Sequence, residues 1–294
     1  TLNGNLTATK TYDGNVSATV STIGVTPSVV YGNDDLTISA ISGTFDSPDV
    51  SSSRVVTATN VTLTGASANN YAMDSSVTQT GTGTISQLAS ATWVGGTGTN
   101  WSVGSNWAVT GNLSQTGVLP NLSNVALAII PSGVTVVANP GVNYTGKIQV
   151  NGGTLQAAND SYLGATPGAA IADLITLNGG TLQATDDFTL NANRGITLGA
   201  NGGTFSVNTD KSVAYAGVIA GTSGLTKSGS GTLTLTGDNT NYSGVTTVAT
   251  GNLVIGGAVK PLGSGDVSVA SRLSFDTSAA VSYDNAFSMT GSAI

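Results

Sequence analysis

The residues of this chain that come nearest to catalytic chemistry are two adjacent carboxylates, Asp186 and Asp187, with Arg194 seven positions further on. Two carboxylates can act as general acid and base on a glycosidic bond, and a polysaccharide lyase needs a basic group beside its acids. Neighbouring residues on one strand point to opposite faces of a sheet, so this pair can act jointly only where a bulge or corner interrupts the strand. We therefore expect no catalytic residues and no enzymatic activity.

All three tryptophans of the chain lie in one Gly-rich stretch, residues 93–107. An indole beside Asn and Ser can stack on the face of a sugar, which makes Trp101 and Trp107 the candidate ligand-binding residues. Tryptophans can also cover the open end of a stack of β-rungs, whose first rung would otherwise expose its apolar interior to water. We favour the capping role.

Composition excludes most other chemistry. His, Cys and Glu are absent, which excludes disulfides, zinc–thiolate sites and mechanisms that depend on histidine. The net charge is −7, and the eight scattered Lys and Arg form no basic stripe, so we expect no nucleic-acid partner. No apolar run approaches the roughly 20 residues of a spanning helix, so this segment is not expected to cross a membrane.

Four acidic residues follow successive strand-like phrases and could form a column of turn carboxylates: Asp160, Asp187, Asp210 and Asp238. Such a column could bind calcium only weakly, because the nine-residue repeat that holds calcium tightly is missing. We predict no metal site and no cofactor.

The strands that position these residues are predicted from a recurring phrase of Gly, a polar residue and an apolar residue, in which the polar residue is Thr in four copies and Asn252 in the fifth. Its copies begin at residues 153, 180, 203, 231 and 251, which are 27, 23, 28 and 20 residues apart. One short strand per copy, with no room for a helix between copies, predicts a β-solenoid of about seven to nine turns. Alternation along each strand directs the apolar residues inward and the threonines to water. We predict one interior column of five side chains: Leu155, Leu182, Phe205, Leu233 and Leu253.

Residues 1–88 carry a different pattern, in which alternating segments are bounded by Gly, Asn, Asp or Pro. This pattern predicts a small antiparallel β domain. The opening Tyr12-Asp13-Gly14, the later Asn70-Tyr71 and a closing strand at 80–85 resemble the YDG domain, a module of large bacterial surface and secreted adhesins. The chain departs from the family at residues 51–53, where three serines stand in place of the usual glycine turn.

Residues 224–265 contain the best-formed repeat, and they resemble the autotransporter-associated β-strand repeat of type V secreted passenger domains. This resemblance implies a right-handed parallel β-helix. The all-β chain then divides into a YDG-like domain at 1–88, a Trp- and Gly-rich junction and cap at 89–110, and the parallel β-helix at 111–294. A start at Thr1 in place of Met suggests an excerpt or a processed product.

The predicted function is a non-enzymatic structural and adhesive segment of a large secreted bacterial surface protein. It would act outside the cell as a rod or stalk in adhesion, biofilm matrix or cell–cell contact. The predicted partners are glycans, extracellular matrix or other copies of the chain. Two alternatives remain open, namely a self-assembling extracellular filament or surface-layer subunit, and a β-helix protein that binds or cleaves polysaccharide.

Overall fold

The computed structural model describes residues 1–74, 78–257, 260–276 and 282–290. They form two compact units, Thr1–Leu88 and Ala89–Ile294. Within the described residues the secondary structure consists of β-strands and three short 3-10 segments, η1 (Ala68–Asn70), η2 (Gly104–Asn106) and η3 (Asp160–Leu163), with no α-helix. The all-β prediction is confirmed, and a β-solenoid of about seven turns follows the first β unit.

The first unit is a closed barrel of five strands, flanked by a short antiparallel pair of β1 (Leu2–Asn3) and β4 (Thr26–Pro27). The barrel strands are β2 (Leu6–Thr11), β3 (Ser17–Val20), β5 (Thr37–Phe45), β6 (Ser51–Thr64) and β7 (Thr80–Ser86). Consecutive strands pair antiparallel, as predicted, while β7 closes on β2 in parallel. An odd number of alternating strands leaves the first and last pointing the same way, so closure requires one parallel pair.

Close approach at this parallel seam depends on glycine. A Cβ at Gly83 of β7 would lie 2.6 Å from the Phe45 ring and 2.7 Å from the Ala8 carbonyl oxygen. Phe45 and Val56 are buried in the barrel core that this glycine allows to form. The barrel interior is therefore filled by a few side chains and by backbone.

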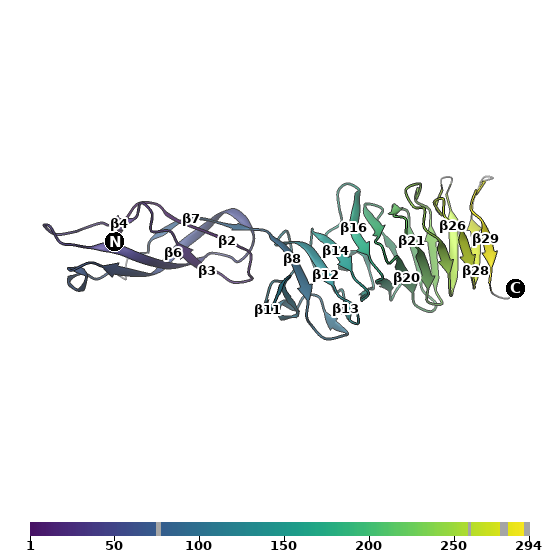
Figure 1. Cartoon of the computed structure of the whole chain (residues 1–294), viewed down its shortest axis with the longest axis horizontal. Coiled ribbons are helices and arrows are strands. Elements are labelled where there is room, and N and C mark those ends of the chain that lie inside the picture. Colours follow the sequence, from purple (N-terminus) through teal and green to yellow (C-terminus); the bar gives the residue numbers. More distant parts are fainter. Residues whose placement is uncertain (75–77, 258–259, 277–281, 291–294) are drawn as a thin grey trace. The chain divides into compact units, whose positions relative to one another are not determined.

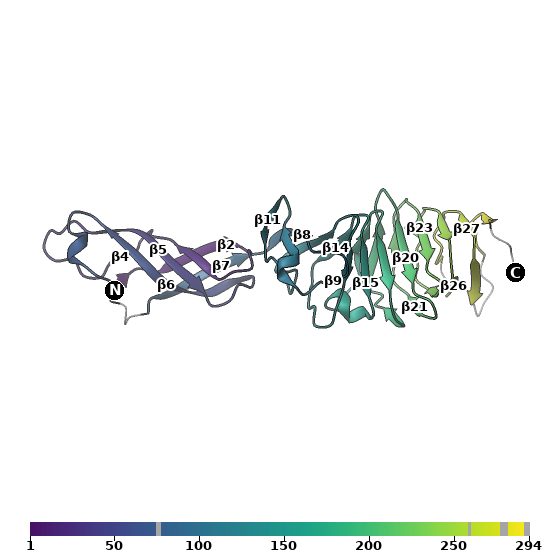
Figure 2. The same ribbon diagram turned by 90° about the horizontal axis from the view of Figure 1, so that it is seen from below.

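The second unit begins with the antiparallel strands β8 (Leu88–Trp93), β10 (Trp107–Val109) and β11 (Asn112–Thr116). From β12 (Val125–Ile130) on, its strands stack in parallel and follow one another in chain order within three sheets (Figures 1 and 2). The first solenoid sheet contains, in spatial order, β11, β10, β8, β12, β14 (Lys147–Val150), β16 (Ile171–Leu177), β19 (Arg194–Leu198) and β22 (Ile219–Ala220). The second contains β9 (Thr99–Asn100), β13 (Thr135–Val137), β15 (Thr154–Ala157), β17 (Thr181–Ala184), β20 (Gly203–Val207), β23 (Leu225–Ser228), β25 (Thr246–Val248), β27 (Val267–Val269) and β29 (Phe287–Met289). The third contains β18 (Phe188–Leu190), β21 (Ser212–Tyr215), β24 (Thr232–Leu235), β26 (Asn252–Gly256) and β28 (Arg272–Asp276).

The cross-section of the solenoid changes along its length. Turns before β18 place strands in the first and second sheets, whereas turns after β22 place them in the second and third. The second solenoid sheet is therefore the face that continues through every turn.

The five predicted core residues are all buried, but the prediction of one column is wrong. Leu155, Leu182 and Phe205 stack in register on the second solenoid sheet. Leu233 and Leu253 stack on the third solenoid sheet instead. The recurring phrase occupies two faces of the solenoid. Its first three copies form strands of the second solenoid sheet, whereas the copies that begin at residues 231 and 251 form β24 and β26 of the third.

Candidate functional site

The tryptophan stretch folds into the interior of the solenoid's first turns. Trp93, Trp101 and Trp107 are only 2%, 2% and 0% exposed, and both Trp93 and Trp101 meet the Trp107 ring edge-on, with centroids 5.1 and 4.6 Å apart. The Trp101 Nε1–H donates to the Pro120 carbonyl at 2.9 Å, and the Trp107 Nε1–H donates to the Trp101 carbonyl at 2.8 Å. A sugar platform needs an exposed indole face, and Trp101 and Trp107 do not offer one.

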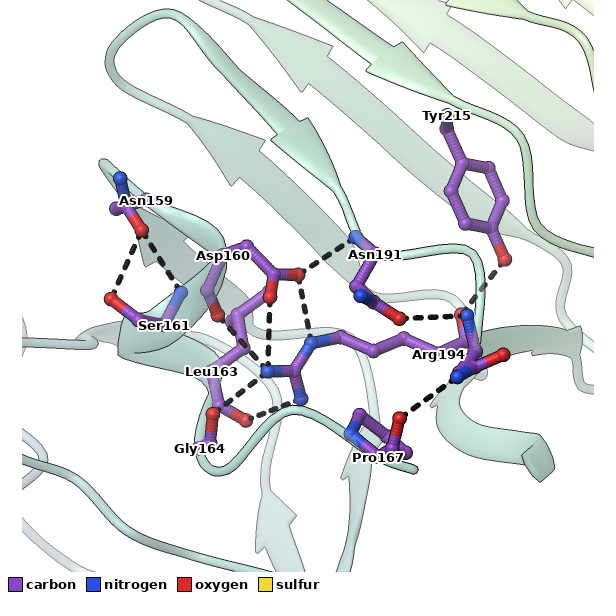
Figure 3. A network of polar contacts seen from close by, with 10 residues as sticks. Asn159, Asp160, Ser161, Leu163, Gly164, Pro167, Asn191, Arg194 and Tyr215 are labelled. Atoms are coloured by element: carbon purple, nitrogen blue, oxygen red, sulfur yellow. Dashed lines mark hydrogen bonds and ion pairs between the residues drawn. The ribbon is translucent and has the colours of Figure 1, made fainter. Parts of the chain in front are cut away.

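Arg194 lies at the start of β19 with its guanidinium buried among backbone carbonyls (Figure 3). Its Nε donates to Asp160 Oδ1 at 2.8 Å, and its Nη2 donates to the Gly164 carbonyl at 2.7 Å. Further bonds reach the Leu163 carbonyl, the Asp160 carbonyl and Asp160 Oδ2, each at 3.2 Å. Arg194 therefore fastens η3 to the next turn of the solenoid, and its donors are engaged by protein.

A cavity of about 310 Å³ lies beside this clamp, and Tyr144, Pro167, Leu174 and Arg194 contribute to its lining. The Tyr144 hydroxyl donates to the Lys147 carbonyl at 2.8 Å, and burial raises the pKa of Tyr144 well above its usual value. No carboxylate lines the cavity. The lining therefore lacks the pair of carboxylates that glycoside hydrolysis uses.

Asp186 and Asp187 lie in the corner between β17 and β18, apart from the Arg194 ion pair. Lys211 Nζ contacts Asp186 Oδ1 at 2.7 Å and Asp187 Oδ2 at 3.9 Å. The hydrogen bond from Lys211 lowers the pKa of the Asp186 carboxyl. The Asp187 carboxylate also accepts from the Ser212 N–H at 2.6 Å. The three residues considered for catalysis thus belong to two separate structural ion pairs.

The four turn acids do not form one column of ligands. Asp160 pairs with Arg194, Asp187 caps the backbone at Ser212, and Asp238 Oδ1 accepts from the Thr240 N–H at 3.1 Å. Asp210 adopts a positive φ of 60° in its turn. Within the part of the chain that the structure describes, no three acidic side chains gather as metal ligands do.

Sequence reasoning missed a lysine inside the solenoid. Lys227 is fully buried and stacks between Phe205 and Val248 on the second solenoid sheet, in the interior column. Its Nζ donates to the carbonyls of Ser228 and Gly229 at 2.8 Å each and to that of Thr250 at 3.1 Å. Residues 225–228 alternate between inward and outward positions as a strand does. The inward position of Lys227 was not recognised from the sequence, because a charged residue there breaks the expected apolar pattern.

The outward positions of the turns carry polar side chains, some of which pair from turn to turn. Gln156 Nε2 donates to Gln183 Oε1 at 2.9 Å, and Gln183 Nε2 donates to Asn208 Oδ1 at 2.8 Å. Asn201 likewise donates through its backbone N–H to Asn178 Oδ1 at 3.1 Å. These ladders bind successive turns together on the outside of the solenoid.

Two family models match the chain. Residues 1–80 match the YDG domain, and residues 132–157 and 225–255 match the passenger-associated-transport-repeat. The second repeat match falls on the stretch that the sequence analysis singled out. Both resemblances are confirmed, and together they support a passenger region of a type V secreted adhesin.

A similar protein of known name also supports an autotransporter adhesin. The chain is 30% identical over 139 residues to the adhesin BmaC autotransporter of Brucella suis biovar 1 (strain 1330). The alignment covers 47% of this chain and 4% of the relative's length. No solved structure matches the chain. None of the helical segments among the described residues has the length and apolar character needed to cross a membrane.

Proposed function

We propose that this chain is a secreted adhesive segment of a bacterial surface protein, in which the solenoid serves as a rod-like spacer and its polar faces make the contacts. The passenger-associated repeats and the autotransporter adhesin relative support a secreted or surface location. Because each turn adds about 4.8 Å of stacked strand, the number of turns sets the reach of such a segment. We extend the proposal to adhesion, biofilm matrix and cell–cell contact as the settings in which it acts.

The observation that carries the proposal is the difference between the apolar side chains inside the solenoid and the polar side chains on its outside. Inward positions of the second solenoid sheet hold Leu155, Leu182 and Phe205, all buried, while outward positions hold Thr, Gln and Ser. The interior columns keep the turns stacked. The outward faces offer many equivalent polar groups, which suits weak contacts repeated over a surface.

The segment 89–110 is proposed to cap the solenoid and belongs to the same compact unit. Its strands β8 and β10 pair antiparallel, and β10 pairs antiparallel with β11, ahead of the parallel stack that begins with β12 and β14. Antiparallel pairing and the buried Trp101 and Trp107 cover the apolar interior of the first turns. In this proposal, Trp101 and Trp107 contribute to the stability of the solenoid.

An adhesion assay tests the proposal. Beads coated with the purified chain are passed over immobilised glycans, extracellular-matrix proteins and the chain itself, and the same preparation is incubated with polysaccharides to measure new reducing ends. We expect retention on at least one surface and no turnover. Retention only on the chain itself would favour the self-assembling filament. Turnover that disappears in Asp187→Asn would replace the adhesive function with a polysaccharide-cleaving one.

A further inference from the structure

The second solenoid sheet carries an unbroken outward row of hydroxyl side chains. Register pairs them one after another along the sheet, and each is at least partly exposed. This hydroxyl row consists of Thr135, Thr154, Thr181, Thr204, Thr226, Thr247, Ser268 and Ser288. Strands in a sheet lie about 4.8 Å apart, so the hydroxyls repeat at that interval.

The hydroxyls of this row have no hydrogen-bond partner among the described residues, unlike several amide side chains of the solenoid. Gln156, Gln183 and Asn208 bond one another from turn to turn. By contrast, no Oγ atom of the hydroxyl row bonds to any residue that the structure describes; for example, Thr204 and Thr226 contribute only backbone pairing. A hydroxyl offers one donor and two acceptor lone pairs, so the row presents unused capacity of both kinds.

A shallow groove of about 470 Å³ runs beside the middle of the row. It crosses three successive turns, and its lining includes Asn201, Gly202, Ser223 and Gly224 as well as Thr204 and Thr226 of the hydroxyl row. The lining contains no charged residue. Asn201 directs its side-chain amide and its backbone N–H to Asn178 Oδ1, which leaves its own Oδ1 available as an acceptor.

We propose that this groove and the hydroxyl row bind an extended neutral polysaccharide that lies along the solenoid axis. This inference rests on the proposed adhesive function and assigns it a face and a ligand class. Sugar hydroxyls donate and accept, as the row does, and the rise of one unit in an extended 1,4-linked chain is comparable to the spacing of the strands. A polyanion would need cations that the lining lacks.

The same features disfavour a protein partner on this face. Protein interfaces depend on buried aromatic or arginine anchors, whereas the outward positions of β15, β17, β20 and β23 are only Thr, Gln and Ser. Each sugar contact is individually weak, since a neutral hydrogen bond replaces one with water. Contacts repeated on successive turns make affinity rise steeply with the length of the glycan.

The test compares the whole chain with two double variants. Thr204→Val with Thr226→Val removes two hydroxyls beside the groove and keeps the β-branched shape that suits a strand. Thr232→Val with Thr234→Val makes the same change on β24 of the third solenoid sheet and serves as the matched control. Binding of cello-oligosaccharides of increasing length is measured by calorimetry, with oligogalacturonates as the charged counterpart.

We expect affinity for cello-oligosaccharides to increase with length and to fall about tenfold in the groove variant but not in the control variant. Equal loss in both variants, or equal binding of oligogalacturonate, would overturn the inference. Absence of binding to either oligosaccharide series would also overturn it. If the beads still adhere to another surface in that case, the adhesive function stands while the glycan site falls.

Discussion

Single charged residues inside this solenoid are held by backbone carbonyls more than by opposite charges. Arg194 donates to three carbonyls and to one carboxylate, that of Asp160. Lys227 donates to three carbonyls, and no carboxylate among the described residues forms an ion pair with it. Burying a charge is costly unless its hydrogen bonds are satisfied, and the corners of the solenoid supply the acceptors.

We predict that Asp160→Asn destabilises the second unit by about 3 kcal/mol, because it leaves the buried Arg194 guanidinium without its counter-charge. The matched control is Asp173→Asn, which breaks the Lys147–Asp173 pair, whose side chains are 50% and 49% exposed. An exposed pair contributes less than about 1 kcal/mol. Urea unfolding of both variants measures the difference, and equal losses would contradict a structural role for the clamp.

A second residue-scale prediction concerns pH. Burial lowers the pKa of Lys227 to about 8 from 10.5. Between these values the unfolded chain holds the proton and the folded chain has released it, so stability rises with pH across this window, by up to about 3 kcal/mol. Below pH 8 the folded chain keeps Lys227 protonated, so the full free-energy cost of burying its charge is present.

The comparison that isolates this effect is wild type against Lys227→Met, with unfolding measured at intervals from pH 7 to 10.5. Burial raises the pKa values of Tyr144, Tyr215 and Tyr242, which lowers stability above pH 10 in both proteins and cancels in the difference. A difference in stability that stays constant with pH would show that Lys227 keeps its proton when buried.

At the scale of elements, the recurring phrase of Gly, a polar residue and an apolar residue was sufficient to predict a solenoid but not the path of its turns. Alternation identifies which side chain points inward, as it does for Leu182 and Leu233. It does not identify the sheet to which a strand belongs, because the lengths of the corners decide that. The charged Lys227 at an inward position also concealed the strand that continues the column beyond Phe205.

The candidate site was less predictable than the fold for a related reason. The Gly-rich stretch around Trp101 and Trp107 was compatible with both sugar binding and capping, and only the three-dimensional packing shows that both indoles are buried. The threonines of the repeat were predicted to face water. Their continuation through Thr226 and Thr247 into one row depends on the register of strands whose sequences depart from the phrase.

We predict that Leu233→Asp destabilises the second unit by several kcal/mol, on the order of 4, because it places an unpaired charge between Val213 and Leu253 in a fully buried column. Thr234→Asp on the same strand is the matched control, since its side chain points outward. Chemical denaturation measures both. Comparable losses would mean that the assigned inward and outward faces of β24 are wrong.

At the scale of the whole molecule, the two units achieve stability by different means. The first unit closes its sheet, so every barrel strand has two neighbours, and its core is local to residues 1–88. The second unit depends on stacking, in which each turn covers the apolar columns of the one before. Each unit therefore has a core of its own.

We predict two separable unfolding transitions, each sensitive to substitutions in one unit only. Gly83→Ala should lower the stability of residues 1–88, because the new Cβ would lie 2.6 Å from the Phe45 ring in the closed barrel. Leu233→Asp should lower that of residues 89–294 alone. Hydrogen exchange read by mass spectrometry reports both units in one sample of the intact chain. If either substitution accelerates exchange equally in both units, they unfold together, and the core of one unit contributes to the stability of the other.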